Sequence, residues 1–465
     1  MTVSRRASVF SNVPVDIVSM KFHIKTYGCQ MNERDSEALA CLLEADGAVP
    51  TDSEEEADLI IFNTCSVRDQ AERKAVGKIG FMKKIKARKP GLIVGCIGCM
   101  AQNHGDQLLK DLPVLDFVAG TDQIHRVPEI VKDILRTRRR TAETQLDKII
   151  RPELDGHHPG AVVAEVAVMR GCDQFCSYCI VPHTRGREKS RPIPAIVEEV
   201  KRLVDAGTRE ILLLGQNITA YGVAEARQDG TYTKDFSAFA DLLAAVNDVP
   251  GLARIRFTSP HVHFMNDKFI QAVRDLPKVC KCFHVPLQSG SDRILKLMRR
   301  SYTAAEYLDC IHKIREGLPE VNFTTDVIVG FPTETEEDFN LTRQLMKDVV
   351  YDMAYIFRYS PRGGTKSARD YPDDVPEETK HLRNQILLED LEAGAAERNA
   401  RFKDTVQEIL VEGVSKRNSE RWTGRTTLNK VCNFLPVEGI RPGDLVNVRI
   451  KRTTANSLFG EIMAE

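Results

Sequence analysis

Cys172, Cys176 and Cys179 lie close together in the sequence, directly after an apolar, β-rich run at 162–169. They are therefore expected on a loop at the end of a strand. Three thiolates at this spacing can bind three irons of a [4Fe–4S] cluster and leave the fourth iron open to a substrate or cofactor. A closed zinc site is the alternative, with His183 as its fourth ligand. The spacing alone leaves both kinds of site open.

A second set of cysteines is dispersed in sequence but falls at equivalent positions. Cys29, Cys65 and Cys99 each end or closely follow a β-rich run. Parallel strands place their carboxyl ends at one edge of a sheet, so the three thiols are expected to converge there. Two alternatives remain open: all three are buried core thiols, or Cys96, which forms a C-x2-C pair with Cys99, takes the third position. The other cysteines match no ligand motif and are interpreted as core or surface thiols: Cys41, Cys280, Cys282, Cys310 and Cys432.

Polar residues elsewhere fall where a cofactor would be bound. The loop 182–191 is rich in cations, and the forked guanidinium groups of Arg185 and Arg187 suit phosphate or carboxylate, although a solvated charged face is the alternative. Further cofactor-binding candidates follow or lie in expected strands, where glycine and polar residues also serve ordinary turns: Gln216, Asn217, Ser289 and Asp326. Three histidines beside expected strands are interpreted as having protein partners: His261, His263 and His284.

The elements that must position these residues follow two alternating patterns. From 22 to 135, short β-rich runs alternate with helical patterns at 32–46, 69–88, 103–111 and 123–135, which predicts an open parallel α/β sheet. The basic, turn-rich stretch 137–160 is expected to be a linker. From 161 to 396 six strand–helix units predict a partial (β/α)6 barrel whose chemistry sits at the carboxyl ends of its strands. The six strands are expected at 162–169, 210–215, 253–259, 280–287, 324–330 and 353–360.

The last part of the chain has a different pattern. A long helix is expected at 376–402, and after it alternating residues predict a small antiparallel β-barrel. Residues 401–465 hold eleven Lys and Arg against eight Asp and Glu, which fits either a solvated barrel or a nucleic-acid-binding module. Trp422, Phe434 and Phe459 can stack on unpaired bases or fill the core of this barrel.

Composition restricts the class of protein. The 465 residues carry 65 Lys and Arg against 66 Asp and Glu, a net charge of −1, so any nucleic-acid contact must be local. Residues 1–20 have no secretory signal pattern and are expected to be an extension before a second start at Met20. Twelve cysteines without an export signal indicate a reducing compartment, and no apolar run is long enough to span a membrane. We therefore expect a cytoplasmic protein.

Four motifs carry a resemblance to a known family. The sequence resembles the radical S-adenosylmethionine (SAM) methylthiotransferases, and most closely the MiaB-type tRNA methylthiotransferases. The motifs are YGCQMNERDSE at 27–37, NTCSVRDQAERK at 63–74, GCMAQ at 98–102 and RGCDQFCSYCIVPHTRGREKSRP at 170–192. The resemblance implies a methylthiotransferase domain at 21–136, a radical SAM domain at 161–396 and an RNA-binding, OB-like TRAM domain at 397–465.

The same resemblance implies an activity and its cofactors. Cys29, Cys65 and Cys99 would hold an auxiliary [4Fe–4S] cluster, and Cys172, Cys176 and Cys179 the cluster that generates a radical from SAM. The enzyme would insert a methylthio group at carbon 2 of N6-isopentenyladenosine in a tRNA anticodon stem-loop. It would act as a monomer with an external reductant such as flavodoxin or ferredoxin. The alternatives are the same chemistry on threonylcarbamoyl-adenosine tRNA or on a ribosomal protein aspartate, and a non-catalytic iron–sulfur RNA-binding protein.

Overall fold

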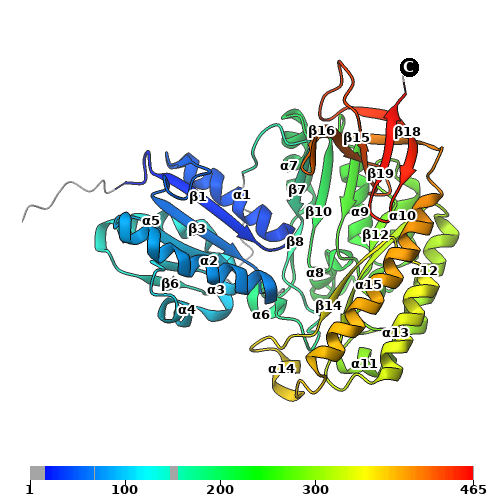
Figure 1. Ribbon diagram of the computed structural model, residues 1–465, viewed down its shortest axis with the longest axis horizontal. Coiled ribbons are helices and arrows are strands. Elements are labelled where there is room, and N and C mark those ends of the chain that lie inside the picture. The colour runs from blue at the N-terminus through cyan, green and yellow to red at the C-terminus, as the bar shows by residue number, and fades with distance from the viewer. Residues whose placement is uncertain (1–15, 67–68, 147–155, 464–465) are drawn as a thin grey trace, which may run out of the picture. The chain divides into compact units, whose positions relative to one another are not determined.

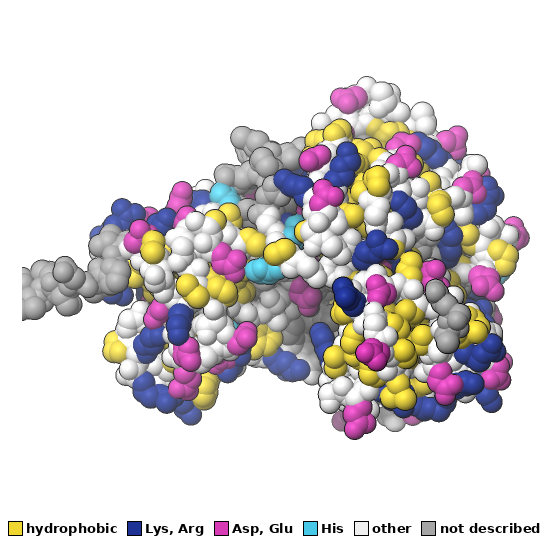
Figure 2. All heavy atoms as spheres, turned by 90° about the horizontal axis from the view of Figure 1, so that it is seen from above, with side chains coloured by type: hydrophobic (Ala, Val, Ile, Leu, Met, Phe, Trp, Pro, Cys, Tyr) yellow, Lys and Arg dark blue, Asp and Glu magenta, His cyan; other side chains and the backbone are white. Residues whose placement is uncertain are grey.

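The computed structural model describes residues 16–66, 69–146 and 156–463. This part of the chain forms two compact units, which meet in sequence between Gly156 and His157. Basic and acidic side chains are interspersed over the face seen in Figure 2, in keeping with the net charge of −1. Within the described ranges no helix is long and apolar enough to cross a membrane.

The first unit is a parallel sheet of six strands in the order β2-β1-β3-β4-β5-β6 (Figure 1). Its strands are β1 (Lys21–Tyr27), β2 (Val49–Pro50), β3 (Leu59–Thr64), β4 (Ile93–Gly98), β5 (Phe117–Ala119) and β6 (Thr141–Glu143). Its helices are α1 (Gln30–Ala45), α2 (Asp69–Arg88), α3 (Cys99–His104), α4 (Asp106–Asp111) and α5 (Val127–Thr137), with the 3-10 turn η1 (Thr121–Arg126). The expected open parallel α/β sheet is confirmed.

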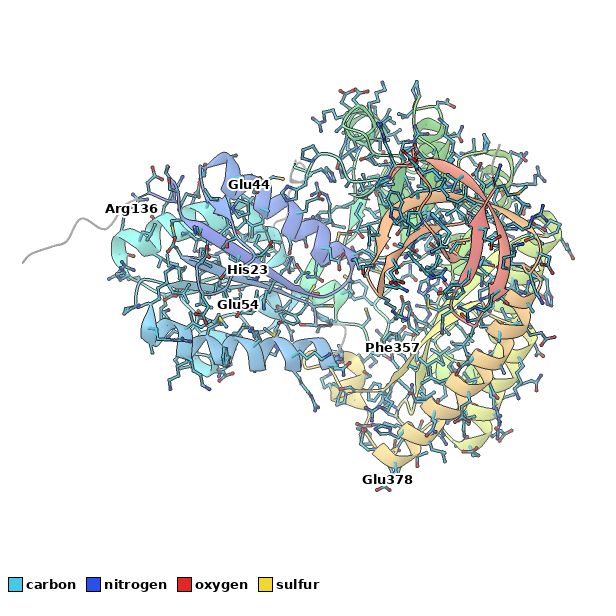
Figure 3. All side chains as sticks on the ribbon, turned by 45° about the horizontal axis from the view of Figure 1, so that its top comes forward. His23, Glu44, Glu54, Arg136, Phe357 and Glu378 are labelled. Carbon is cyan, nitrogen blue, oxygen red and sulfur yellow. The ribbon has the colours of Figure 1, made fainter. Side chains whose placement is uncertain are left out.

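Helices cover both faces of this sheet, which explains the apolar runs of its central strands. Every residue of β3 and β4 is buried, as expected for parallel strands enclosed on both sides. Side chains of α1 and α5 pack on one face, and those of α2, α3 and α4 pack on the other. Glu54, labelled in Figure 3, lies between β2 and β3. It forms ion pairs with Lys25 on β1 and with Lys78 on α2, the latter at 2.8 Å.

Two features of this unit differ from the expectation. The helix expected at 103–111 is the pair α3 and α4, separated at Gly105, where the backbone takes a φ of +49°. The expected linker 137–160 contributes β6, which pairs in parallel with β5 and so belongs to the edge of the sheet. Part of that linker, 147–155, lies outside the described residues. The strand β6 has the sequence TAE and little β-propensity of its own, so only its pairing with β5 reveals it.

The expected extension 1–20 lies partly in the fold. Its first fifteen residues are outside the described part, but Ile17 is fully buried in the core between the sheet, α1 and α5. The backbone N–H of Ser19 donates to Gly47 O at 2.8 Å, and Val49 N donates to Met20 O at 2.8 Å. The folded domain therefore begins before Met20.

We expect Ile17→Ala to lower the free energy of unfolding of the first unit by about 2 to 5 kcal/mol, because a buried methyl-rich side chain is replaced by a cavity. Val18→Ala is the matched control: Val18 is 56% exposed, and its loss should change stability by less than about 0.5 kcal/mol. Denaturant unfolding monitored by circular dichroism measures both. Equal effects of the two substitutions would contradict the burial of Ile17.

The second unit begins with the partial barrel, and all six expected strands are present. They are β7 (Val163–Ala167), β10 (Glu210–Leu214), β11 (Arg254–Phe257), β12 (Cys282–His284), β13 (Asn322–Val329) and β14 (Met353–Arg358). They form two parallel three-stranded sheets, joined where Ile255 on β11 bridges in parallel to Val279 before β12. The run expected as one strand at 162–169 is divided, because the chain leaves β7 and forms a short hairpin of β8 (Met169–Arg170) with β9 (Lys189–Ser190).

Helices alternate with the strands, and most of them contribute side chains to the core of this part. They are α6 (Val181–Arg185), α7 (Ile193–Asp205), α8 (Val223–Gln228), α9 (Ala238–Asn247), α10 (Asp267–Asp275), α11 (Asp292–Leu297), α12 (Ala304–Gly317), α13 (Glu336–Val349), α14 (Lys366–Asp370) and α15 (Glu377–Ala400), with 3-10 turns η2 (Ile218–Ala220) and η3 (Val262–Phe264). The long helix expected at 376–402 is α15.

The chain ends in a closed five-stranded barrel in the order β15-β16-β17-β19-β18. The strands are β15 (Val406–Ser415), β16 (Asn418–Arg425), β17 (Val431–Phe434), β18 (Leu445–Thr453) and β19 (Leu458–Ile462). All pairs are antiparallel as expected, except for the parallel pair of β17 with β19. Phe434 is fully buried and fills the core, whereas Phe459 is half-buried under the guanidinium of Arg452, 3.9 Å from its ring centroid.

The loop between β16 and β17, residues 426–430, docks on the amino-terminal ends of the partial-barrel strands. Arg256 on β11 donates to Thr426 O at 2.6 Å and to Thr427 O at 3.0 Å. The amide of Asn322, at the start of β13, donates to Leu428 O at 2.6 Å. Active sites of β/α barrels lie at the opposite, carboxyl ends. The terminal barrel therefore closes the end of the partial barrel that is remote from the expected chemistry.

Candidate active site

The three dispersed cysteines of the first unit meet at one edge of its sheet. β1, β3 and β4 are neighbours, and the register aligns Tyr27 with Thr64 and Thr64 with Gly98. Cys65 directly follows the last residue of β3, and Cys99 directly follows the last residue of β4. Cys29 lies two residues after Tyr27, the last residue of β1. Cys65 N donates to Tyr27 O at 2.9 Å, so the turn after β3 is fixed to the end of β1. The predicted convergence of these strand ends is confirmed.

An asparagine pair fixes the turns that carry these cysteines. Asn32 and Asn63 are fully buried, and Asn32 Nδ2 donates to Asn63 Oδ1 at 2.9 Å. Asn32 Oδ1 lies 3.3 Å from Cys29 Sγ. Gly98, with φ +89°, must be glycine, because a Cβ there would lie 2.7 Å from Thr64 O. The two asparagines were not singled out from sequence, although both stand beside the predicted cysteines.

Cys96 is separated from this edge. It lies inside β4 opposite Phe62 and packs in the apolar cluster under α2 and α3. Its thiol contacts Thr64 Oγ1 at 3.6 Å, and burial raises its pKa to about 12. Its side chain lies in this apolar core and not at the strand ends that carry Cys29, Cys65 and Cys99, which disfavours Cys96 as a ligand with them.

Cys172, Cys176 and Cys179 lie on the loop of the β8–β9 hairpin. Gly171, with φ +77°, allows the loop to approach its return strand, since a Cβ there would lie 2.1 Å from Arg187 O. Cys172 N donates to Gly186 O at 3.2 Å, and Cys179 N donates to Cys176 O at 3.0 Å. The side chain and the N–H of Ser177 donate to Leu297 O and Met298 O, which ties the loop to the end of α11.

The three thiols of this loop interact with one another. Burial raises the pKa of the Cys172 thiol well above its usual range, and the neighbouring Cys179 and Cys176 raise it further. Deprotonated thiols would repel one another here, so a bound cation is needed to hold them as thiolates. Among the described residues no Cys, His, Asp or Glu side chains form the compact group of three that a single metal ion requires.

Buried polar atoms without a partner mark the carboxyl ends of successive strands. They are Gln216 Oε1 and Asn217 Nδ2 after β10, His261 Nε2 after β11 and Gln288 Oε1 after β12. His261 Nδ1 accepts a hydrogen bond from His263 N at 3.3 Å, so the unpartnered Nε2 carries the proton. Buried polar groups rarely lack partners. These residues therefore fit a polar ligand such as SAM, and the interpretation of His261 as satisfied by protein partners is wrong for Nε2.

The other cofactor candidates have protein partners or occupy different places. Arg187 forms a bidentate ion pair with Asp173 at 2.6 and 3.0 Å. Arg185 is buried at the end of α6. Asp326 lies within β13, with Oδ2 3.3 Å from His284 Nε2 on β12.

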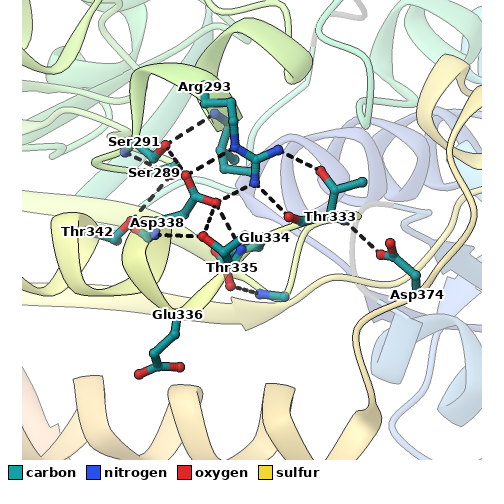
Figure 4. A network of polar contacts seen from close by, with 12 residues as sticks. Ser289, Ser291, Arg293, Thr333, Glu334, Thr335, Glu336, Asp338, Thr342 and Asp374 are labelled. Carbon is teal, nitrogen blue, oxygen red and sulfur yellow. Dashed lines mark hydrogen bonds and ion pairs between the residues drawn. The ribbon is translucent and has the colours of Figure 1, made fainter.

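Ser289 is fully buried and belongs to a network that fixes α11 to α13 (Figure 4). Its hydroxyl lies 3.3 Å from Thr342 Oγ1. Nearby, Asp338 accepts hydrogen bonds from Ser291 Oγ at 2.6 Å, from Thr335 Oγ1 at 2.7 Å and from Arg293. This network holds the turn directly after Gln288, whose own backbone pairs with β13 through Asp326 O and Ile328 N.

Arg300 was not anticipated from sequence. It follows α11, and its Nη1 lies 3.4 Å from Cys176 Sγ. A guanidinium beside the cysteine loop fits an anionic group bound by the three thiolates. It is the second of two consecutive arginines after a short helix, and no local pattern distinguishes it from a surface cation.

The comparisons with known proteins agree with this arrangement. The models of uncharacterized protein family UPF0004, the radical SAM superfamily and the TRAM domain match residues 21–120, 166–346 and 401–463. A cysteine loop on a partial β/α barrel with these matches defines a radical SAM enzyme, which uses SAM and [4Fe–4S] clusters. The tRNA-2-methylthio-N(6)-dimethylallyladenosine synthase of Akkermansia muciniphila is 45% identical to this chain, over 95% of this chain and 98% of its own length. The synthase of the same name from Opitutus terrae is 43% identical, over 95% of this chain and 97% of its own length. The chain belongs to this family of methylthiotransferases.

Among solved structures, the radical SAM methyltransferase TsrM from Kitasatospora setae, with cobalamin and a [4Fe–4S] cluster bound, has a TM-score of 0.55. The match covers 76% of this chain and 77% of TsrM at 13% sequence identity. At this identity the likeness concerns the fold alone. It supports the α/β architecture derived above.

Proposed function

We propose that this protein inserts a methylthio group at carbon 2 of N6-dimethylallyladenosine next to the tRNA anticodon. The observation that carries the proposal is the near-full-length similarity to synthases named for this product. Two cysteine triads on separate strand edges support it, because the reaction needs both a radical generator and a second sulfur-handling centre. The TRAM match and the exposed cations of β18, Arg449, Lys451 and Arg452, support a tRNA substrate.

We assign the two triads different roles. Cys172, Cys176 and Cys179 would bind a [4Fe–4S] cluster with one open iron, and Cys29, Cys65 and Cys99 an auxiliary one. When bound, the clusters and SAM supply the radical that attacks an inert C–H bond and the sulfur that replaces its hydrogen. The chain itself fixes both cysteine loops, excludes water from Cys172 and Cys65 by burial, and presents unpartnered polar atoms after β10, β11 and β12.

The polar atoms after β10, β11 and β12 are the proposed SAM contacts. Gln216, Asn217, His261 and Gln288 have unpartnered buried atoms that a nucleoside and an amino acid group would satisfy. Arg185, Arg187, Ser289 and Asp326 remain in the proposal as residues that shape this site. We further propose a monomer in the cytoplasm, reduced by flavodoxin or ferredoxin.

The test is nucleoside analysis of tRNA from a strain that lacks the protein. We expect 2-methylthio-N6-dimethylallyladenosine to disappear and N6-dimethylallyladenosine to accumulate, and the wild-type chain to restore the product. The Cys172→Ala chain should not restore it. Loss of a methylthiolated threonylcarbamoyl-adenosine instead, or an unchanged nucleoside profile, would contradict the assigned substrate.

A further inference from the structure

Arg300 is a cation in direct contact with the cysteine loop. Its Nη1 lies 3.4 Å from Cys176 Sγ, and its guanidinium carbon lies 4.8 Å from the ring centroid of Tyr302. Its Nε donates to the hydroxyl of Tyr302 at 3.0 Å. Among the described residues, no Asp or Glu carboxylate forms an ion pair with Arg300. A half-buried guanidinium surrounded by neutral groups is costly unless an anion lies beside it.

Tyr302 fixes the orientation of this cation. Its hydroxyl proton is shared between Pro286 O at 2.8 Å and Leu287 O at 3.0 Å, so Tyr302 is anchored to the segment after β12. The ring is buried and packs against His261, with centroids 5.5 Å apart. The neighbouring Arg299 takes a left-handed φ of +58° and is exposed. The chain therefore turns between the two arginines so that only Arg300 points toward Cys176.

We propose that Arg300 stabilises the reduced form of the cluster held by Cys172, Cys176 and Cys179, an inference that rests on the proposed function. Three thiolates outweigh the charge of an oxidised [4Fe–4S]2+ core, so this site is anionic. Reduction adds one electron from the external reductant, breaks no bond and increases the negative charge. A positive charge and a hydrogen bond to a ligand sulfur favour that reduced state and raise the reduction potential. Arg300 is thus a positioning residue that acts through Cys176.

The experiment is a redox titration of the reconstituted full-length protein with dithionite, followed by electron paramagnetic resonance. The cluster with the open iron is recognised as the one whose signal changes when SAM is added. In Arg300→Gln we expect the ratio of reduced to oxidised cluster at a fixed potential to fall about tenfold, a downward shift of about 59 mV for a one-electron couple. Arg300→Lys keeps the charge and should show a smaller shift, and the control Arg299→Gln should show none.

An Arg300→Gln protein with full iron content and an unchanged potential would overturn the inference. If Arg300→Gln fails to retain the cluster, the variants Arg300→Lys and Tyr302→Phe test the inference instead. Both should lower the reduction potential, and an unchanged potential in both variants would overturn the inference. A wild-type protein without any SAM-sensitive signal would instead contradict the proposed function. The potential reports the immediate surroundings of the bound cluster, so a general loss of stability does not imitate the expected result.

Discussion

Replacing Cys172, Cys176 and Cys179 together by Ala should lower the iron content from about eight to about four per chain and abolish both SAM cleavage and methylthiolation. The remaining iron would belong to the first unit, where Cys29, Cys65 and Cys99 end neighbouring strands. Iron and sulfide analysis and chromatographic detection of 5′-deoxyadenosine measure the two effects. Loss of all iron, or of none, would contradict the assignment of two separate sites.

The converse substitution should separate the two activities. Cys65→Ala removes a thiol of the auxiliary edge and should abolish methylthiolation, while SAM is still cleaved by the intact loop of the second unit. Cys96→Ala is the matched control, because Cys96 is a buried cysteine of the same sheet with its side chain in the apolar core. It should retain about eight irons and most of the activity. If Cys96→Ala removed methylthiolation and Cys99→Ala spared it, the third ligand would be Cys96.

Arg256→Met should lower the free energy of unfolding of the second unit by about 3 to 5 kcal/mol, because it leaves a buried carboxylate without its partner. Arg256 Nε donates to Glu210 Oε1 at 2.8 Å, and Glu210 is only 3% exposed. The substitution also removes the two hydrogen bonds that Arg256 donates to carbonyl oxygens of the loop 426–430. Calorimetry measures the change, and limited proteolysis should cleave near the end of α15.

The double variant Arg256→Met with Glu210→Gln is the control for this prediction. It removes the unpaired carboxylate and should recover a substantial part of the stability lost in the single variant. Equal stability of the single and double variants would show that the lost carbonyl contacts, and not the buried charge, dominate. Unchanged stability in Arg256→Met would contradict the docking of the loop.

Sequence patterns sufficed for the six strands of the partial barrel and for the convergence of cysteines, because both follow from local periodicity and from the shared direction of parallel strands. They missed the short strands β6, β8 and β9. The spacing of Cys96 and Cys99 alone does not distinguish which of them is the third ligand. In the structure Cys96 pairs with Phe62 of the neighbouring strand and so lies inside the sheet. Ile17 was missed because an isolated isoleucine before the first strand carries no periodic signal. Arg300 was missed for a related reason, since its contact with Cys176 spans 124 positions of the chain.

The docking of the terminal barrel depends on backbone groups more than on side chains. Arg254, Arg256 and Asn322 all donate to carbonyl oxygens of the segment 425–428. Every residue type offers the same carbonyl, so most substitutions in this loop are tolerated when its path is kept, whereas insertions and deletions are not. Lys430 is the exception, because its Nζ pairs with the buried Asp352 at 2.9 Å. A TRAM domain transplanted from another protein should therefore dock if its loop has the same length and shape and keeps a cation at this position.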